Sequence, residues 1–305
     1  MSNQTTTQPQ PFKEKITTWY NAINDLISQN YWSYTLSFAR TSFALCTLLT
    51  LLFNSDAALV FGLKEHLVFG DIEYYSIFQI FNNLWISRVV ACSILLLVIS
   101  GYLPKISAVL HWWVAFSFML SCSLIEGGDQ IAAIFTLLLI PILFLDKRKN
   151  TWHKPIKNDN FYANTIAFCA FLAIKLQAFT IYFFASTGKF QVTEWTNGTA
   201  VYYWFSDSVF GLNENLFHLV TPLLKSPYLV TLLTWSVLLG EFLLALSIFY
   251  SHGRFKKIMF FVGILLHFSF AISFGLWSFF FAMNGVLLLG LTNITNLKKP
   301  FGTTN

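Results

Sequence analysis

Residues 228–250 read YLVTLLTWSVLLGEFLLALSIFY, an apolar run with one carboxylate, Glu241, near its middle. A helix needs roughly 20 mostly apolar residues to cross about 30 Å of hydrocarbon, and this run meets that length. The ten-residue alternation of apolar and polar residues that is typical of a transmembrane β-barrel is absent. The run therefore predicts a membrane-spanning helix.

The rest of the chain repeats this pattern. Of 305 residues, 55% are hydrophobic and only 11% are charged, against about 25% charged in soluble domains. Further apolar runs occupy about 34–53, 86–103, 106–125, 130–145, 161–186, 258–277 and 279–293. We predict an all-α, polytopic transmembrane helical bundle of about eight spans. Because the fourth and the last runs are short, six or seven full spans with re-entrant segments is an alternative.

The chain begins with a polar stretch, residues 1–11, that lacks the pattern of a cleavable signal peptide. We expect a disordered tail there. Residues 12–33 place apolar side chains at helical spacing between polar ones, which predicts an interfacial amphipathic helix. The transmembrane domain is then expected at 34–295, and a cytoplasmic tail at 296–305.

Lysine and arginine predict the orientation of this domain. Most of them fall into the N-terminal segment, the short loops around 105, 147–157 and 254–257, and the C-terminal tail. The positive-inside rule places these parts in the cytoplasm, with both termini. We expect a multi-pass protein of the cytoplasmic (inner) membrane, in contact with lipids and with no nucleic-acid partner. Segments 54–85 and 187–227 would be extracytoplasmic.

Four isolated cysteines, Cys46, Cys92, Cys122 and Cys169, lie within apolar runs without any CxxC pattern. We expect small core residues and no metal site.

Several ionisable residues lie inside the predicted spans, where a charge is costly unless it is paired or hydrated. They are Arg40, His111, Lys175, Glu241 and His267. One interpretation is structural: Arg40 or Lys175 pairs with Glu241 and fixes the bundle. The other is that some of these residues line a polar cavity open to the outer face.

Residues 126–135, EGGDQIAAIF, interrupt two apolar runs. The glycines permit a tight turn, and Asp129 can cap the helix that we expect to begin near residue 130. A carboxylate at the outer membrane surface can also face a cavity, so Glu126 and Asp129 are candidates for both roles.

Residues 182–205, YFFASTGKFQVTEWTNGTAVYYWF, follow the fifth predicted span on the outer side. Part of the aromatic content fits an interfacial belt. Lys189 would lose hydration among these rings, which favours the neutral amine of a base or nucleophile. Alternatively, the Lys189 side chain extends so that its ammonium group lies among the lipid headgroups. Asn197 and Gly198 predict a turn.

A family resemblance rests on this stretch, together with FARTSFALCTLL around Arg40, EGGDQIAAIFTLLLIPILFLD and LLHFSFAISFGLWSF around His267. These motifs resemble the horizontally transferred transmembrane (HTTM) domain, which is the membrane part of vitamin K-dependent gamma-carboxylase. Within it, KFQVTEWTNGTAVYYWFSDSVFG and the chain length are most similar to the sporulation-delaying protein B family, which helps to mature a secreted antimicrobial peptide.

The resemblance implies roles for individual residues. Lys189 falls on the carboxylase lysine proposed as base toward vitamin K hydroquinone, and His267 falls on a functional histidine. Gly128 and Asp129 stand where the carboxylase has an Asn-His pair, and we expect no counterpart of the soluble domain that holds the carboxylase propeptide. By this resemblance alone, the cofactor would be a lipid quinone.

We therefore expect an integral membrane factor required for maturation of a secreted, sporulation-delaying-like peptide. Its partners would be the precursor peptide and, in one version, a second maturation subunit. The expected catalytic residues are Lys189, His267 and Asp129, and the expected cavity residues are Glu126, Glu194, Trp195, Asn197 and Gly198. The alternatives are a quinone-linked carboxylase-like enzyme and a non-enzymatic scaffold or immunity protein. The sequence leaves open whether the step is chemical.

Overall fold

The computed structural model describes residues 12–55, 75–81, 83–122, 126–250 and 253–292. These residues form helices, with an isolated β-bridge between Tyr102 and Asn150. The helices are α1 (Phe12–Ile27), α2 (Tyr34–Phe53), α4 (Ile77–Ile80), α5 (Leu84–Ser100), α6 (Pro104–Ser121), α7 (Gly127–Phe144), α8 (Phe161–Lys189), α9 (Thr193–Thr196), α10 (Ala200–Ser206), α11 (Glu214–Leu224), α12 (Pro227–Phe249), α13 (Gly253–Phe274) and α14 (Trp277–Leu291).

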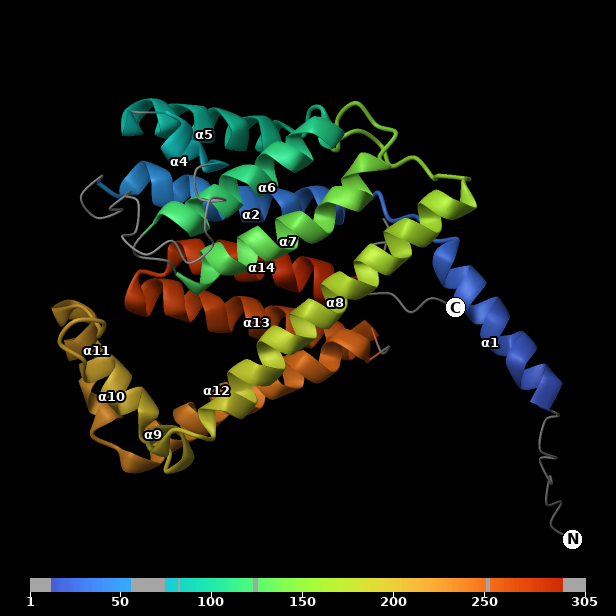
Figure 1. The fold of residues 1–305 in the computed structure, drawn as a ribbon. Coiled ribbons are helices and arrows are strands. Elements are labelled where there is room, and N and C mark those ends of the chain that lie inside the picture. The colour runs from blue at the N-terminus through green and yellow to red at the C-terminus, as the bar shows by residue number, and fades with distance from the viewer. Residues whose placement is uncertain (1–11, 56–74, 82, 123–125, 251–252, 293–305) are drawn as a thin grey trace, which may run out of the picture.

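A helix occupies the place of each predicted span. Within the described ranges, five of them, α2, α7, α8, α12 and α13, are long and apolar enough to cross a membrane, while α5 and α14 are shorter apolar helices. Successive long helices run in alternating directions through the bundle (Figure 1). The protein is thus an all-helical, multi-pass membrane protein, and the number of about eight crossings stays a prediction.

Helix α14 lies at the centre of the bundle, packed against α2, α7, α8 and α13 (Figure 1). Small residues permit its close approach to its neighbours. A Cβ atom at Gly285 would lie 2.7 Å from the Phe43 ring of α2, and one at Gly263 of α13 would lie 2.7 Å from Leu287. Glycine at these contacts lets helices pack closely in a membrane, where dispersion contributes much of the association energy.

Helices α8 and α12 form an antiparallel pair beside this core, and α8 is the longest helix described, with 29 residues. Three short helices, α9, α10 and α11, connect the end of α8 to the start of α12 at the lower left of Figure 1. This connection brings Lys189, the last residue of α8, close to the residues of α12.

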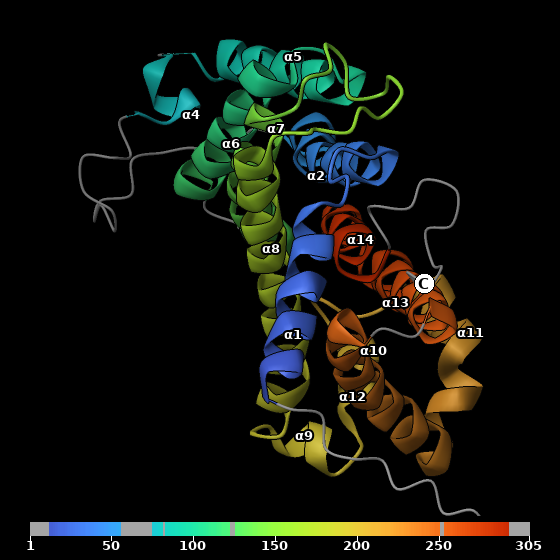
Figure 2. The ribbon, with the colours of Figure 1, turned by 90° about the vertical axis from the view of Figure 1, so that its right-hand side faces the viewer.

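The predicted N-terminal amphipathic helix is present as α1, which extends out of the bundle and contacts α8 (Figure 2). Several of its apolar side chains are exposed, among them Ile16 at 54% and Trp19 at 72% accessibility, while Ile27 in its last turn is buried. Such a face suits the membrane surface, and that location stays a prediction. The predicted tails 1–11 and 296–305 lie outside the described residues.

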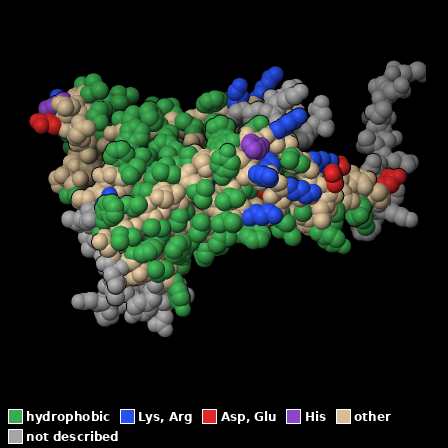
Figure 3. Space-filling view, turned by 90° about the horizontal axis from the view of Figure 1, so that it is seen from above, with side chains coloured by type: hydrophobic (Ala, Val, Ile, Leu, Met, Phe, Trp, Pro, Cys, Tyr) green, Lys and Arg blue, Asp and Glu red, His purple; other side chains and the backbone are tan. Residues whose placement is uncertain are grey.

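Basic side chains gather toward one end of the molecule, and apolar side chains cover much of its middle (Figure 3). The loops from α5 to α6, from α7 to α8 and from α12 to α13 lie at that end (Figure 1). The segregation of charge on which the predicted orientation rests is therefore present in three dimensions. Which end faces the cytoplasm stays a prediction.

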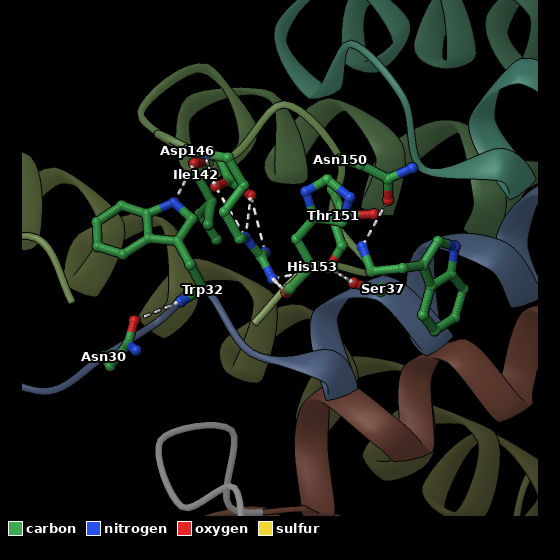
Figure 4. A network of polar contacts seen from close by, with 10 residues as sticks. Asn30, Trp32, Ser37, Ile142, Asp146, Asn150, Thr151 and His153 are labelled. Atoms are coloured by element: carbon green, nitrogen blue, oxygen red, sulfur yellow. Dashed lines mark hydrogen bonds and ion pairs between the residues drawn. The ribbon is translucent and has the colours of Figure 1, made fainter. Parts of the chain in front are cut away.

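The basic loop after α7 differs from a simple solvated loop. Arg148 is 4% accessible and donates to both carboxylate oxygens of Asp146, at 2.8 to 3.2 Å, and to the carbonyl groups of Thr151 and His153. Ser37 of α2 donates to the Thr151 carbonyl at 2.8 Å (Figure 4). This buried network ties the α7–α8 loop to α2.

Tryptophan side chains extend the same network. The Trp32 indole donates to the Ile142 carbonyl at 2.8 Å (Figure 4), and the Trp152 indole donates to the Ile99 carbonyl at 2.9 Å. Asn150 donates to the Ser100 carbonyl at the end of α5. The loop therefore joins α2, α5 and α7 at one end of the bundle.

Candidate functional site

Lys189 and Glu241 form an ion pair between the end of α8 and the middle of α12. The Lys189 Nζ atom lies 2.8 Å from Oε1 and 2.6 Å from Oε2 of Glu241, and it also donates to the Ala185 carbonyl at 2.9 Å. The Lys189 side chain is 23% accessible and that of Glu241 is 6%. The pair is thus largely desolvated, with the lysine on its more open side.

This arrangement corrects the predicted pairing of Glu241 with Arg40 or Lys175. Lys175 lies on α8 well before Lys189, roughly 20 Å along the helix axis at 1.5 Å per residue, and its Nζ lies 5.6 Å from the centre of the Phe171 ring. Arg40 lies on α2, is 1% accessible and donates to Ser107 at 2.7 Å. Glu241 therefore pairs with Lys189, the lysine that lies at the same depth in the bundle.

Trp195 is the predicted cavity residue that contacts Lys189. The Nζ atom lies 5.2 Å from the centre of its ring, a cation–π distance. Trp195 belongs to the short helix α9, which follows Lys189 directly. Trp195 thus lies against the Lys189 ammonium group and covers one side of it.

The other predicted residues of this segment build the turn that positions Trp195. The Asn197 Oδ1 atom accepts from the Thr199 amide at 3.1 Å, and Gly198 adopts φ +81°. A Cβ at Gly198 would lie 2.7 Å from Thr231, so glycine is required by both backbone conformation and space. The predicted turn at Asn197 and Gly198 is confirmed. Glu194 is exposed.

His267 lies deeper, in α13. Its Nε2 atom is 3.0 Å from the Tyr182 hydroxyl of α8, while its Nδ1 atom is buried without a hydrogen-bond partner in the described part of the chain. The ring packs edge-on against Phe279 of α14, with centroids 5.4 Å apart. His267 is therefore a buried, singly bonded histidine that couples α8, α13 and α14.

The acidic turn forms a third group. Glu126 is the N-cap of α7 and Asp129 is its third residue, in a reciprocal capping box. Ser278 of α14 donates to Glu126, and the Cys46 thiol lies 3.9 Å from Asp129 Oδ1. The expected helix start near residue 130 was too late, because the glycines are part of the helix and Glu126 supplies the cap.

The predicted residues thus fall into three groups across α7, α8, α12, α13 and α14. Phe279 lies between two of these groups, because it contacts His267 and also lies against Gly127 and Gly128 in the first turn of α7. Ser186, which lies one turn before Lys189, donates to the Leu238 carbonyl at 3.0 Å. Its hydroxyl group is thus bonded to the backbone of α12, while Lys189 bonds to Ala185 and Glu241. The described residues contain no cluster of three potential metal ligands.

Sequence reasoning missed two residues of this region. Tyr182 precedes Lys189 by two helical turns, so it lies on the same face of α8, and this spacing was a usable signal. Nothing in the sequence pattern marks Ser278 as the partner of Glu126. Glu241 and Lys189 were both singled out, but not as partners of each other.

Two curated relatives cover most of the chain. It is 37% identical over 243 residues to sporulation-delaying protein SdpB of Bacillus subtilis (strain 168), which covers 78% of this chain and 75% of that protein. It is 33% identical over 295 residues to the uncharacterized protein YitO of the same strain, which covers 92% and 90%. No family model and no solved structure matches the chain. On this identity and coverage, the chain belongs to the sporulation-delaying protein B family.

Proposed function

We propose that this protein is a membrane factor for the maturation of a secreted, sporulation-delaying-type peptide, and that it acts on the extracytoplasmic side through the Lys189–Glu241 pair. Family membership supports the biological context, since a relative that is 37% identical carries the sporulation-delaying name. The observation that carries the site is the ion pair, which is 23% accessible on the lysine side and 6% on the glutamate side.

The chemistry available to this pair is proton transfer. A lysine that is bound to a carboxylate at 2.6 Å can pass a proton to it, and the resulting amine can act as base toward a bound peptide or a quinone. Trp195 limits the access of water on one side. By the resemblance to the HTTM domain, Lys189 would act as the carboxylase lysine does, as a base toward a lipid quinone.

The experiment compares intact masses of the small peptides that host cells secrete with the wild-type protein, with Lys189→Ala, or without the protein. Immunoblots of the membrane fraction check that the variant is present. A mature mass that depends on both the protein and Lys189 supports the proposal, and the mass difference identifies the reaction: a gain of carbon dioxide for carboxylation or a lost segment for cleavage. Equal masses in all three strains would refute it.

A non-enzymatic role is the second candidate, and one observation favours it: the ion pair is fully formed and links α8 to α12. In that case the charge-reversed variant Lys189→Glu/Glu241→Lys retains function, because the pair is restored with its partners exchanged. If Lys189 performs chemistry, the reversed pair stays inactive although the protein accumulates. The peptide masses distinguish these outcomes.

A further inference from the structure

A second candidate site lies away from Lys189. An open groove of about 600 Å³ separates the start of α11 from the turn between α13 and α14. It is lined by Gly211, Asn213, Asn215, Leu216, Ala271, Ile272, Ser273, Phe274, Gly275 and Trp277. None of the residues that the sequence predicted for a cavity belongs to this lining.

One wall of the groove is the last turn of α13, residues Ala271–Phe274. The carbonyl groups of a last helical turn lack amide partners within the helix, and they carry the negative end of the helix dipole. The chain then turns at Gly275, with φ +73°. This wall therefore offers hydrogen-bond acceptors and a negative potential to a ligand.

The opposite wall is the start of α11, which would by itself present the positive end of a helix dipole. Two residues offset that potential. The Asn213 side chain accepts from the Leu216 amide at 3.0 Å, and Glu214 lies in the first turn. The Glu214 side chain is 90% accessible, and its Oε1 atom lies 3.9 Å from Nε2 of His218, one turn further along α11. In the chain it stands between Asn213 and Asn215, which line the groove.

The chain that forms this wall carries more acidic than basic side chains; its basic groups are His218 on α11 and Lys225 at the C-cap of α11. Residues 190–224 contain Glu194, Asp207 and Glu214 but neither lysine nor arginine. Backbone amides of Phe210 and Val209 donate to the Asp207 carboxylate and lower its pKa, so this group is ionised at neutral pH. The lining of the groove itself is uncharged and includes apolar surface, such as Trp277 at 46% accessibility.

We propose that this groove binds a segment of a peptide that carries positive charge beside apolar residues. The apolar walls take the apolar side chains, the α13 carbonyl groups accept from peptide amides, and Glu214 attracts the cation. An anionic lipid headgroup is disfavoured by the same acidic rim. The inference rests on the proposed function, in which a secreted peptide is the substrate, and it gives that substrate a chemical class and a docking place.

The test uses the full-length protein in nanodiscs of phosphatidylcholine, with empty nanodiscs as background. The probes are a short fluorescein-labelled peptide of leucine, alanine and lysine, and a matched peptide with glutamate in place of each lysine. Fluorescence anisotropy measures Kd for the wild type, for Glu214→Lys, and for Asp159→Lys. Asp159 is exposed and precedes α8 in the loop from α7, at the opposite end of the bundle, so it receives the same change of charge outside the groove.

We expect the lysine peptide to bind above background and the glutamate peptide not to bind. Glu214→Lys should raise Kd about tenfold, since like charges at an interface rim weaken association, while Asp159→Lys leaves it unchanged. Equal binding of both peptides, or an equal effect of the two substitutions, would overturn the inference. These results are independent of peptide masses in Lys189→Ala cells, so failure of the groove and failure of the proposed function are distinguishable.

Discussion

Lys189 and Glu241 are 52 positions apart in the chain, and their charged groups meet at 2.6 Å in the bundle. Each one is the residue that makes the other tolerable at this depth. A desolvated charge without a partner costs several kcal/mol in a membrane or a protein core. The pair is therefore a structural link between α8 and α12 as well as the proposed functional centre.

Glu241→Gln should lower the thermal stability of the protein in detergent, because it leaves the Lys189 charge without its carboxylate. Loss of one partner of a buried pair costs about 3–5 kcal/mol, and the partial exposure of Lys189 places the expectation at the lower end. The charge-reversed double variant should recover most of this loss. A Glu241→Gln protein with unchanged Tm would show that the pair contributes little.

Tyr182→Phe should destabilise the protein by about 1–3 kcal/mol, the cost of a buried polar group left without its partner. The Tyr182 hydroxyl is the hydrogen-bond partner of His267 Nε2, and Nδ1 is already unpartnered within the described residues. Thr180→Val on the exposed side of α8 is the control. Equal melting temperatures for both variants would contradict the importance of this bond.

The two adjacent glycines at the start of α7 should differ sharply. A Cβ atom at Gly128 would lie 2.8 Å from the Phe279 Cα atom, which is backbone, whereas one at Gly127 would lie 3.5 Å from the Phe279 ring, an ordinary contact. Gly128→Ala should therefore push α14 away from α7 and lower Tm, while Gly127→Ala should be nearly neutral. Similar Tm values for the two variants would contradict the packing described.

The basic loop after α7 offers a similar comparison. Arg148→Ala leaves Asp146 buried without its cation, for which we expect a loss of about 3–5 kcal/mol. Lys147→Ala removes the same charge from an exposed neighbour and should change stability by no more than about 0.5 kcal/mol. Unfolding of both variants in detergent, followed by tryptophan fluorescence, measures the difference. Equal losses would contradict the buried role of Arg148.

The helices were predictable from sequence because a membrane span needs a continuous apolar run, and each run here forms a helix. The short helices α9, α10 and α11 were not predicted as elements, since their apolar residues serve a surface connection rather than a span. Arg148 lies in a basic loop that the sequence predicts to be cytoplasmic, and nothing in the sequence distinguishes it from Lys147 and Lys149, which are exposed in the structure. Burial of one basic residue among three depends on tertiary hydrogen bonds.

The site was predicted in its members but not in its pairings. Glu241 and His267 stood out because ionisable residues are costly inside a membrane. Lys189 stood out as a lysine among aromatic residues directly after a predicted span. Which cation meets Glu241 depends on depth and helix rotation, and a hydropathy profile contains neither. The choice of Lys189 over Lys175 follows from the antiparallel packing of α8 and α12.

The most direct measurement of the central claim is the intact mass of the secreted peptide from cells that carry Lys189→Met or Lys175→Met. Both substitutions remove a lysine from α8, but Lys175 has no part in the Lys189–Glu241 pair. The double variant Lys189→Met/Glu241→Gln leaves no unpaired charge at the site, and it separates loss of function from loss of folding.

We expect a mature mass with Lys175→Met and only the precursor mass with Lys189→Met and with the double variant, all three proteins being present in the membrane. A mature peptide in cells with the double variant would contradict it.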